Sequence, residues 1–135
     1  MTDKNGEKSE EKFNERFKNL RKTNKYIDCQ FKVDAGVYQA HKLILAAASP
    51  VLEAMLYGGM QTNEAIKITD ISGRTFEKFI DYAYTGAIAL REDEDDKLED
   101  LLELYYCGQK YLVDDLRLVF SLNYLIILFF NFYSN

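Results

Sequence analysis

Hydrophobic and polar residues alternate one by one near residue 30 of the chain. Apolar residues at positions 27, 29, 31 and 33 are separated by polar ones. A spacing of two predicts a strand over residues 27–34 with one buried face. The pair Ala35 and Gly36 then favours a tight turn into residues 37–40, so we expect a β-hairpin.

A stretch without any polar face follows the hairpin. Residues 43–48 read Leu-Ile-Leu-Ala-Ala-Ala, which predicts a short helix that protein encloses on all sides. Ser49 is suited to cap the start of a new helix, and Pro50 suits its first position. We therefore expect a second helix from Pro50 to Tyr57, ended by the glycines at 58 and 59.

The remaining pattern predicts an α+β fold, a small β-sheet capped by a cluster of short helices. The elements expected after Gly59 are a strand at 66–68, a helix from Ser72 or Gly73 to Gly86, a very short strand at 88–90, an amphipathic helix from Leu98 that breaks near Cys107 and Gly108, and a last helix from about Gln109.

The N-terminal part of the chain divides into two segments. Residues 1–10 have no periodicity and are expected to be disordered. From Glu11 to Lys22 a helix is expected, with Phe13, Phe17 and Leu20 in one apolar stripe. Such a narrow stripe on a charged helix needs a partner surface, which is either the core of the same chain or a second subunit.

Composition narrows the functional classes. A chain of 135 residues is expected to form one domain, and its net charge of −5 argues against general affinity for nucleic acid. Cys29 and Cys107 lie far apart and have no zinc-site or redox spacing, so we expect reduced thiols in a cytoplasmic or nuclear protein. The charged N-terminus is unlike a signal peptide.

The residues show no catalytic constellation. His41 is the only histidine, and it is expected to be a structural residue at a helix entry. The acid-rich run at 92–100 is typical of a solvated loop and a first helical turn; the alternative, a carboxylate metal site, lacks the glycine and spacing of a calcium loop. We therefore expect no enzyme activity, no cofactor and no metal site.

Taken in order, the motifs resemble those of the BTB/POZ domain family, most closely its members with a following BACK region. The matching segments are Asp28–Phe31 (DCQF), Ala40–Ser49 (AHKLILAAAS), Tyr57–Met60 (YGGM), Ile66–Asp70 (IKITD), Tyr82–Gly86 (YAYTG) and Gln109–Val113 (QKYLV). The expected organisation is a disordered N-terminus (1–10), a BTB/POZ domain (11–119) and an atypical apolar tail (120–135).

The resemblance implies a protein–protein interaction module that forms a homodimer. The dimer interface would include the stripe on the N-terminal helix and a charged pocket at the dimer floor. The residues that the resemblance assigns to this interface are Phe13, Phe17, Leu20, Asp28 and Lys42.

Many BTB proteins that this chain resembles also recruit a cullin scaffold, as substrate adaptors of ubiquitin ligases. The residues implied for that contact are Leu56, Tyr57, Met60 and Tyr111, and the substrate protein is unknown. Thr62 stands where a cullin-binding BTB loop usually carries Glu, so dimerisation or scaffolding without a cullin is an alternative function. Another is a membrane-anchored oligomerisation module, although a membrane is not the expected partner.

The tail departs from the family pattern. From Leu118 to Asn135 the chain has no charged residue, unlike a BACK region. Three interpretations stay open: an extension of the last helix into the core with a frayed end, a marginal membrane anchor, or an altered C-terminus from splicing, intron read-through or a gene-model error.

Overall fold

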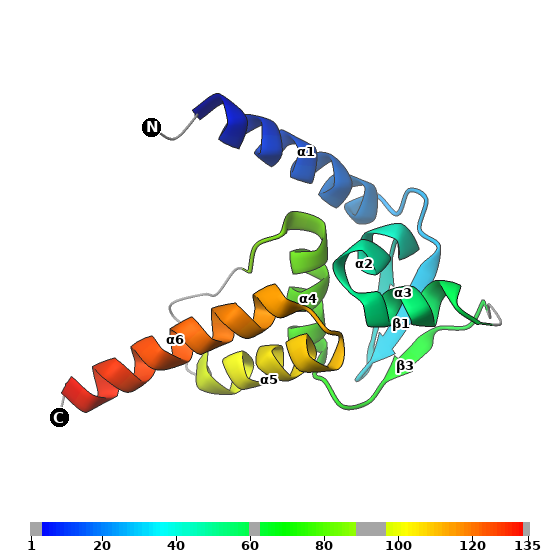
Figure 1. Ribbon diagram of the computed structural model, residues 1–135. Coiled ribbons are helices and arrows are strands. Elements are labelled where there is room, and N and C mark those ends of the chain that lie inside the picture. The colour runs from blue at the N-terminus through cyan, green and yellow to red at the C-terminus, as the bar shows by residue number, and fades with distance from the viewer. Residues whose placement is uncertain (1–3, 60–62, 89–96, 134–135) are drawn as a thin grey trace.

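The computed structural model describes residues 4–59, 63–88 and 97–133 of the chain, and it has the predicted α+β architecture (Figure 1). The elements in chain order are α1 (Lys4–Lys22), β1 (Cys29–Val33), β2 (Gly36–Ala40), α2 (Lys42–Ala48), α3 (Pro50–Tyr57), β3 (Ile66–Ile68), α4 (Gly73–Thr85), α5 (Lys97–Lys110) and α6 (Asp114–Tyr133).

The sheet has the strand order β2-β1-β3. The strands β1 and β2 form the predicted antiparallel hairpin, while β3 pairs with β1 in parallel. Asp34 has a φ of 51°, so the turn begins at this residue, one position before the expected pair. Cys29, Phe31 and Val33 make up the buried face of β1, as the alternation predicted.

Aromatic side chains connect the sheet to the helices in the core. Phe31 on β1 lies 5.1 Å from Phe76 on α4, measured between ring centroids. Phe79, also on α4, stacks on Tyr111 with 5.2 Å between the centroids and 12° between the ring planes. These buried rings fix α4 between the sheet and the end of α5.

The break between α2 and α3 has the predicted cap. The Ser49 hydroxyl accepts a hydrogen bond from the Leu52 backbone N–H (3.1 Å) and donates one to the Tyr111 carbonyl oxygen (2.6 Å). Pro50 occupies the first helical turn, where its missing N–H leaves no bond unmade. Ser49 is fully buried, so one side chain both starts α3 and joins it to the segment after α5.

The structure corrects the prediction that α2 is enclosed on all sides. Only Leu45 of this seven-residue helix is buried, and Leu43 is 70% exposed. The helix packs on α3 and α4. Those two helices cover the side of α2 that carries Leu45 and leave the side that carries Leu43 open.

The boundary between α5 and α6 also differs from the prediction. The helix α5 continues through Cys107 and Gly108 to Lys110, and the turn lies at residues 111–113, where Leu112 has a φ of 54°. A Cβ on Gly108 would lie 3.0 Å from the Leu116 Cβ. This glycine therefore allows α6 to approach α5 closely and does not end the helix.

Both ends of the chain are more helical than expected (Figure 1). The helix α1 begins at Lys4, where disorder was predicted, because this segment is rich in the strong helix formers Glu and Lys. Ser9 also donates a hydrogen bond to the Asn5 carbonyl. At the other end, α6 continues to Tyr133. From Leu125 onward, the apolar side chains whose positions the structure describes are exposed, so they do not enter the core.

The short strand expected at 88–90 does not form at Ile88, and residues 89 and 90 lie outside the described residues. Among the helices of the described ranges, none is long and apolar enough to cross a membrane.

Candidate protein-interaction surfaces

The apolar stripe of α1 is divided between the core and the surface. Phe17 packs against the core, and Leu20 is partly buried. Phe13 is 56% exposed, although its ring lies 4.9 Å from that of Phe17 in an edge-on arrangement. The same chain therefore covers the C-terminal half of the stripe, and Phe13 remains at the surface.

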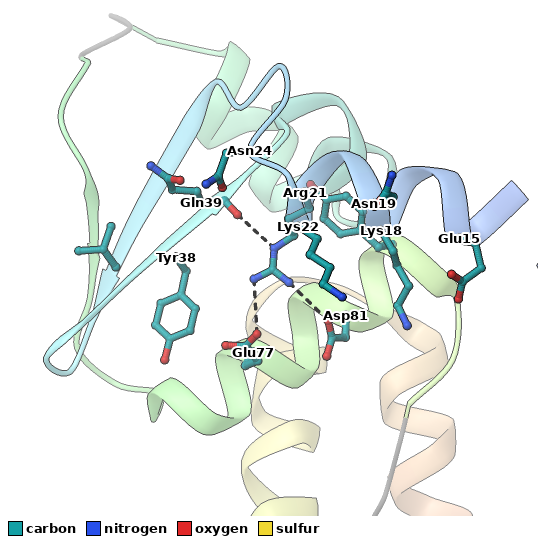
Figure 2. A pocket seen from close by; sticks show the side chains of 12 residues that line it. Glu15, Lys18, Asn19, Arg21, Lys22, Asn24, Tyr38, Gln39, Glu77 and Asp81 are labelled. Atoms are coloured by element: carbon teal, nitrogen blue, oxygen red, sulfur yellow. Dashed lines mark hydrogen bonds and ion pairs between the residues drawn. The ribbon is translucent and has the colours of Figure 1, made fainter.

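Arg21 anchors α1 to the rest of the domain (Figure 2). Its Nε donates a hydrogen bond to the Gln39 carbonyl of β2 (3.1 Å). Its two terminal nitrogens lie 3.4 Å from Asp81 and 3.6 Å from Glu77 on α4. The guanidinium also lies 5.8 Å from the centroid of the Tyr84 ring, within cation–π range. One side chain thus contacts both a strand and a helix.

A hollow of about 810 Å³ lies between three elements: the C-terminal half of α1, the strand β2 and the helix α4 (Figure 2). Its walls carry charges of both signs, with Lys18 and Lys22 on α1 and Glu77 and Asp81 on α4. Charges of opposite sign on facing helices favour the observed position of α1. The individual exposed pairs contribute little, and the less exposed Arg21 is the main anchor.

His41 joins three segments around the start of α2. Its Nε2 lies 2.6 Å from the Lys25 carbonyl oxygen, and its Nδ1 lies 2.5 Å from the Tyr84 hydroxyl. That hydroxyl accepts a further hydrogen bond from the His41 backbone N–H (3.0 Å). All three contacts are satisfied by a neutral ring with its proton on Nε2 and a Tyr84 hydroxyl that donates to Nδ1. The predicted structural role of His41 at a helix entry is confirmed.

Asp28 and Lys42, assigned to the charged pocket of a dimer, are neighbours in the structure. The Asp28 carboxylate accepts a hydrogen bond from the Lys42 backbone N–H (2.7 Å). The His41 side chain at the N-cap position makes no capping bond. Asp28 takes over this role, since it accepts a backbone N–H from the first turn of α2. Both residues line a hollow of about 280 Å³ that also includes Leu56 and Glu64.

The residues assigned to a cullin contact do not form one surface. Tyr57 is 48% exposed at the end of α3, whereas Leu56 is buried beneath it. Met60 lies outside the described residues. Tyr111 is fully buried against Phe79, so it presents no surface to a partner, which corrects the role expected of it. The half-exposed Met55, two residues earlier on α3, points to another side of the helix and lines the hollow that holds Asp28 and Lys42.

The acid-rich run supplies the expected acidic first turn of α5 with Glu99 and Asp100, of which Glu99 is exposed and Asp100 is not. Residues 92–96 lie outside the described residues, but the nearly buried Asp100 pairs with Arg74 (2.9 Å) and Lys78 (3.2 Å) and so joins α5 to α4. Within the described ranges, no three His, Cys, Asp or Glu side chains are close enough to hold a metal ion.

Sequence reasoning missed the role of Arg21. Phe13, Phe17 and Arg21 are spaced four residues apart, so they share one face of α1. The sequence could have shown this, because Arg21 continues the apolar stripe of Phe13 and Phe17 by one further turn. A cation in that position indicates that the C-terminal end of the helix is the end attached to the domain.

Comparison with known proteins gives consistent matches. The sequence model of the BTB/POZ domain matches residues 17–120. Human BTB/POZ domain-containing protein 9 is 34% identical over 82 residues, which are 58% of this chain and 13% of that protein. Mouse Kelch-like protein 3 is 44% identical over 57 residues, which are 41% of this chain and 10% of that protein.

The fold has a match among solved structures as well. The BTB domain of zebrafish PATZ1 superposes with a TM-score of 0.69 at 24% identity, covering 90% of this chain and 94% of that one. The chain spans only about an eighth or less of the length of the curated relatives named above.

Proposed function

This chain belongs to the BTB/POZ domain family and is a protein–protein interaction module, and we propose that it forms a homodimer that serves as a substrate adaptor of a cullin-RING ubiquitin ligase. The observation that carries the dimer is the exposure of apolar side chains on α1 and α2. Phe13 is 56% and Leu43 is 70% exposed, although both belong to segments whose sequence predicts a covered apolar face.

The geometry supports a second copy as the partner of these helices. Arg21 holds α1 on the domain, so Phe13 is presented from a fixed element. Lys42 is next in sequence to Leu43 at the start of α2, and Asp28, which precedes β1, accepts the Lys42 backbone N–H, so both supply polar groups near Leu43. An apolar centre with a polar rim is the usual anatomy of a protein interface.

The dimer is tested by replacing Phe13 and Leu43 together with glutamate. Both side chains are mostly exposed, so the substitutions leave the core intact. We expect the variant to lose one association step in sedimentation equilibrium at micromolar concentration. The control Leu102→Gln, also at a partly exposed apolar position but on α5, retains that step. Unchanged association of the glutamate variant would contradict the proposed interface.

The cullin contact rests on the family resemblance and on the end of α3. Tyr57 exposes about half of its side chain there, directly before the two glycines of the loop. Aromatic side chains and methionine are enriched in interface centres. Because Thr62 replaces the usual Glu, one charged contact is missing, and we expect the affinity to be lower by about 1 kcal/mol, or roughly fivefold.

Binding to a purified cullin N-terminal region, measured by calorimetry, tests this contact. We expect Tyr57→Ala to weaken binding at least tenfold, Leu102→Ala on α5 to leave it unchanged, and Thr62→Glu to strengthen it. A wild-type chain that dimerises but binds no cullin would overturn the adaptor role.

That outcome would favour the second candidate function, a dimerisation or scaffold module without a cullin. The burial of Tyr111 favours this candidate, because it removes one of the four residues assigned to the cullin contact.

A further inference from the structure

The exposed side of α6 carries a regular apolar stripe. Leu118, Leu125 and Phe132 recur every seven residues, and Leu128 and Phe129 follow Leu125 by three and four residues. On a helix this spacing places all five side chains along one side, as in the seam of a coiled coil. We call these five residues the α6 stripe. Their exposed fractions range from 46% to 78%.

The opposite side of the first turn of α6 is covered by the domain, whereas Phe130 near the other end of the helix is exposed. Leu116 is buried, and α6 approaches α5 closely at Gly108. Figure 1 shows α6 beside α5 in its first turns and extending beyond the domain toward the C-terminus. The stripe therefore lies on a helix that is attached to α5 through its first turns, and it is separate from Phe13 on α1 and Leu43 on α2.

We propose that the α6 stripe is a second self-association surface, which pairs with the α6 stripe of another copy of this chain. The chain has no charged residue from Leu118 onward, so two copies of the stripe meet without like-charge repulsion. The same spacing of apolar residues on both helices allows knobs-into-holes packing. Close to the C-terminus, Phe129, Phe132 and Tyr133 form a cluster, with 4.4 Å between the Phe129 and Tyr133 ring centroids.

The available area is sufficient for such a pair. An aromatic side chain buries about 150–250 Å² and a leucine somewhat less, so the exposed fractions correspond to roughly 500–600 Å² on each copy. The pair would then bury about 1,100 Å² in total, just above the roughly 1,000 Å² expected of a specific interface.

A second copy fits this surface better than a lipid bilayer. Helices that lie in a membrane interface usually carry Lys or Arg along their polar face. On α6 the only basic residue is Arg117, which pairs with Asp114 one turn before it. Because the helix lacks further basic residues, it has no electrostatic attraction to anionic lipids.

Two separate self-association surfaces on one chain have a consequence for assembly. If each surface joins two copies around its own twofold axis, alternate use of the two surfaces extends the assembly beyond a dimer. The wild-type chain would then form species that grow with concentration.

Four proteins of equal length separate this proposal from the proposed α1–α2 dimer. They are the wild type, the Phe13→Glu and Leu43→Glu variant, a stripe variant with Leu118→Gln, Leu125→Gln and Phe132→Gln, and the combination of both. Light scattering is expected to give concentration-dependent masses above a dimer for the wild type. The expected mass is that of a dimer for each single-surface variant and that of a monomer, 15.7 kDa, for the combination.

The stripe substitutions are at exposed positions, and glutamine is a good helix former, so circular dichroism should show an unchanged fold. A stripe variant with the wild-type mass distribution would overturn the proposal, whereas failure of the α1–α2 dimer would appear only in the glutamate variant. Wild-type protein that stays dimeric and pellets with neutral or anionic phospholipid vesicles would also overturn it, in favour of a lipid surface.

Discussion

Replacing Ser49 with alanine should destabilise the domain more than the same substitution at Ser72 or Ser9. The Ser49 hydroxyl accepts from the Leu52 N–H and donates to the Tyr111 carbonyl, and the residue is fully buried. Alanine removes both bonds and introduces no steric conflict. The loss therefore measures what this hydroxyl contributes to the joint between α3 and the end of α5.

The magnitude follows from the two bonds. Loss of an N-cap hydroxyl costs about 1 kcal/mol. A buried carbonyl left without its donor costs about 1–3 kcal/mol more. We therefore expect the free energy of unfolding to fall by about 2–4 kcal/mol, which corresponds to a shift of the urea midpoint of roughly 1–2 M for a domain of this size.

The two other serines serve as matched controls. Ser72 caps α4 by accepting from the Thr75 N–H and also donates to the Glu103 carboxylate, but it is only partly buried, so Ser72→Ala should cost about 1–2 kcal/mol. Ser9 lies on the exposed side of α1, where alanine is the better helix former, so Ser9→Ala should change stability by less than about 0.5 kcal/mol.

Urea unfolding followed by circular dichroism checks the expected order of destabilisation, Ser49→Ala above Ser72→Ala above Ser9→Ala. The measurements use the combined variant, which carries the glutamate substitutions at Phe13 and Leu43 and the glutamine substitutions in the α6 stripe, so that self-association does not contribute to the stability. If Ser49→Ala is no more destabilising than Ser9→Ala, the assignment of a buried, doubly bonded hydroxyl is refuted.

Three further predictions concern titratable groups and the anchor of α1. Burial raises the pKa of Cys29 and Cys107 to about 12, so a thiol reagent at neutral pH should label them only after unfolding; rapid labelling of folded protein contradicts this. The hydrogen bond from Lys110 lowers the pKa of Asp70, so the ionised carboxylate stabilises the folded state at neutral pH. That contribution to the free energy of unfolding is lost as the pH falls through the lowered pKa of Asp70. The substitution Asp70→Asn should therefore make the free energy of unfolding depend less on pH in the acid range. Arg21→Met should make α1 several-fold more sensitive to trypsin; an unchanged cleavage rate contradicts the anchor.

Local chemistry made much of the fold predictable. The hairpin, the cap at Ser49 and the stop at Gly86 depend on residues close in sequence, and all were predicted correctly. Gly108 was not, because its role depends on Leu116 of the next helix and no local pattern distinguishes packing from a helix stop.

The candidate sites were less predictable, because exposure is a property of the whole fold. Leu43 and Tyr111 are both apolar residues in apolar surroundings, and the sequence does not show that one faces solvent while the other stacks beneath α4. The α6 stripe, in contrast, follows a spacing that can be read in the sequence, and the structure added the information that its side chains are exposed whereas Leu116 in the first turn is buried.

The structure predicts two kinds of inherited defect, one at Ser49 in the core and one at Arg21, which attaches α1 to the domain. A variant at Ser49 would lower the amount of folded protein in the cell, since a loss of a few kcal/mol raises the unfolded fraction available to proteases. A variant at Arg21 would leave the core, and so the protein's abundance, nearly intact while releasing the helix that carries Phe13. If the proposed dimer is needed for function, the Arg21 product in a cross between carriers of the two alleles would accumulate normally and yet fail to provide the function that the Ser49 allele lacks.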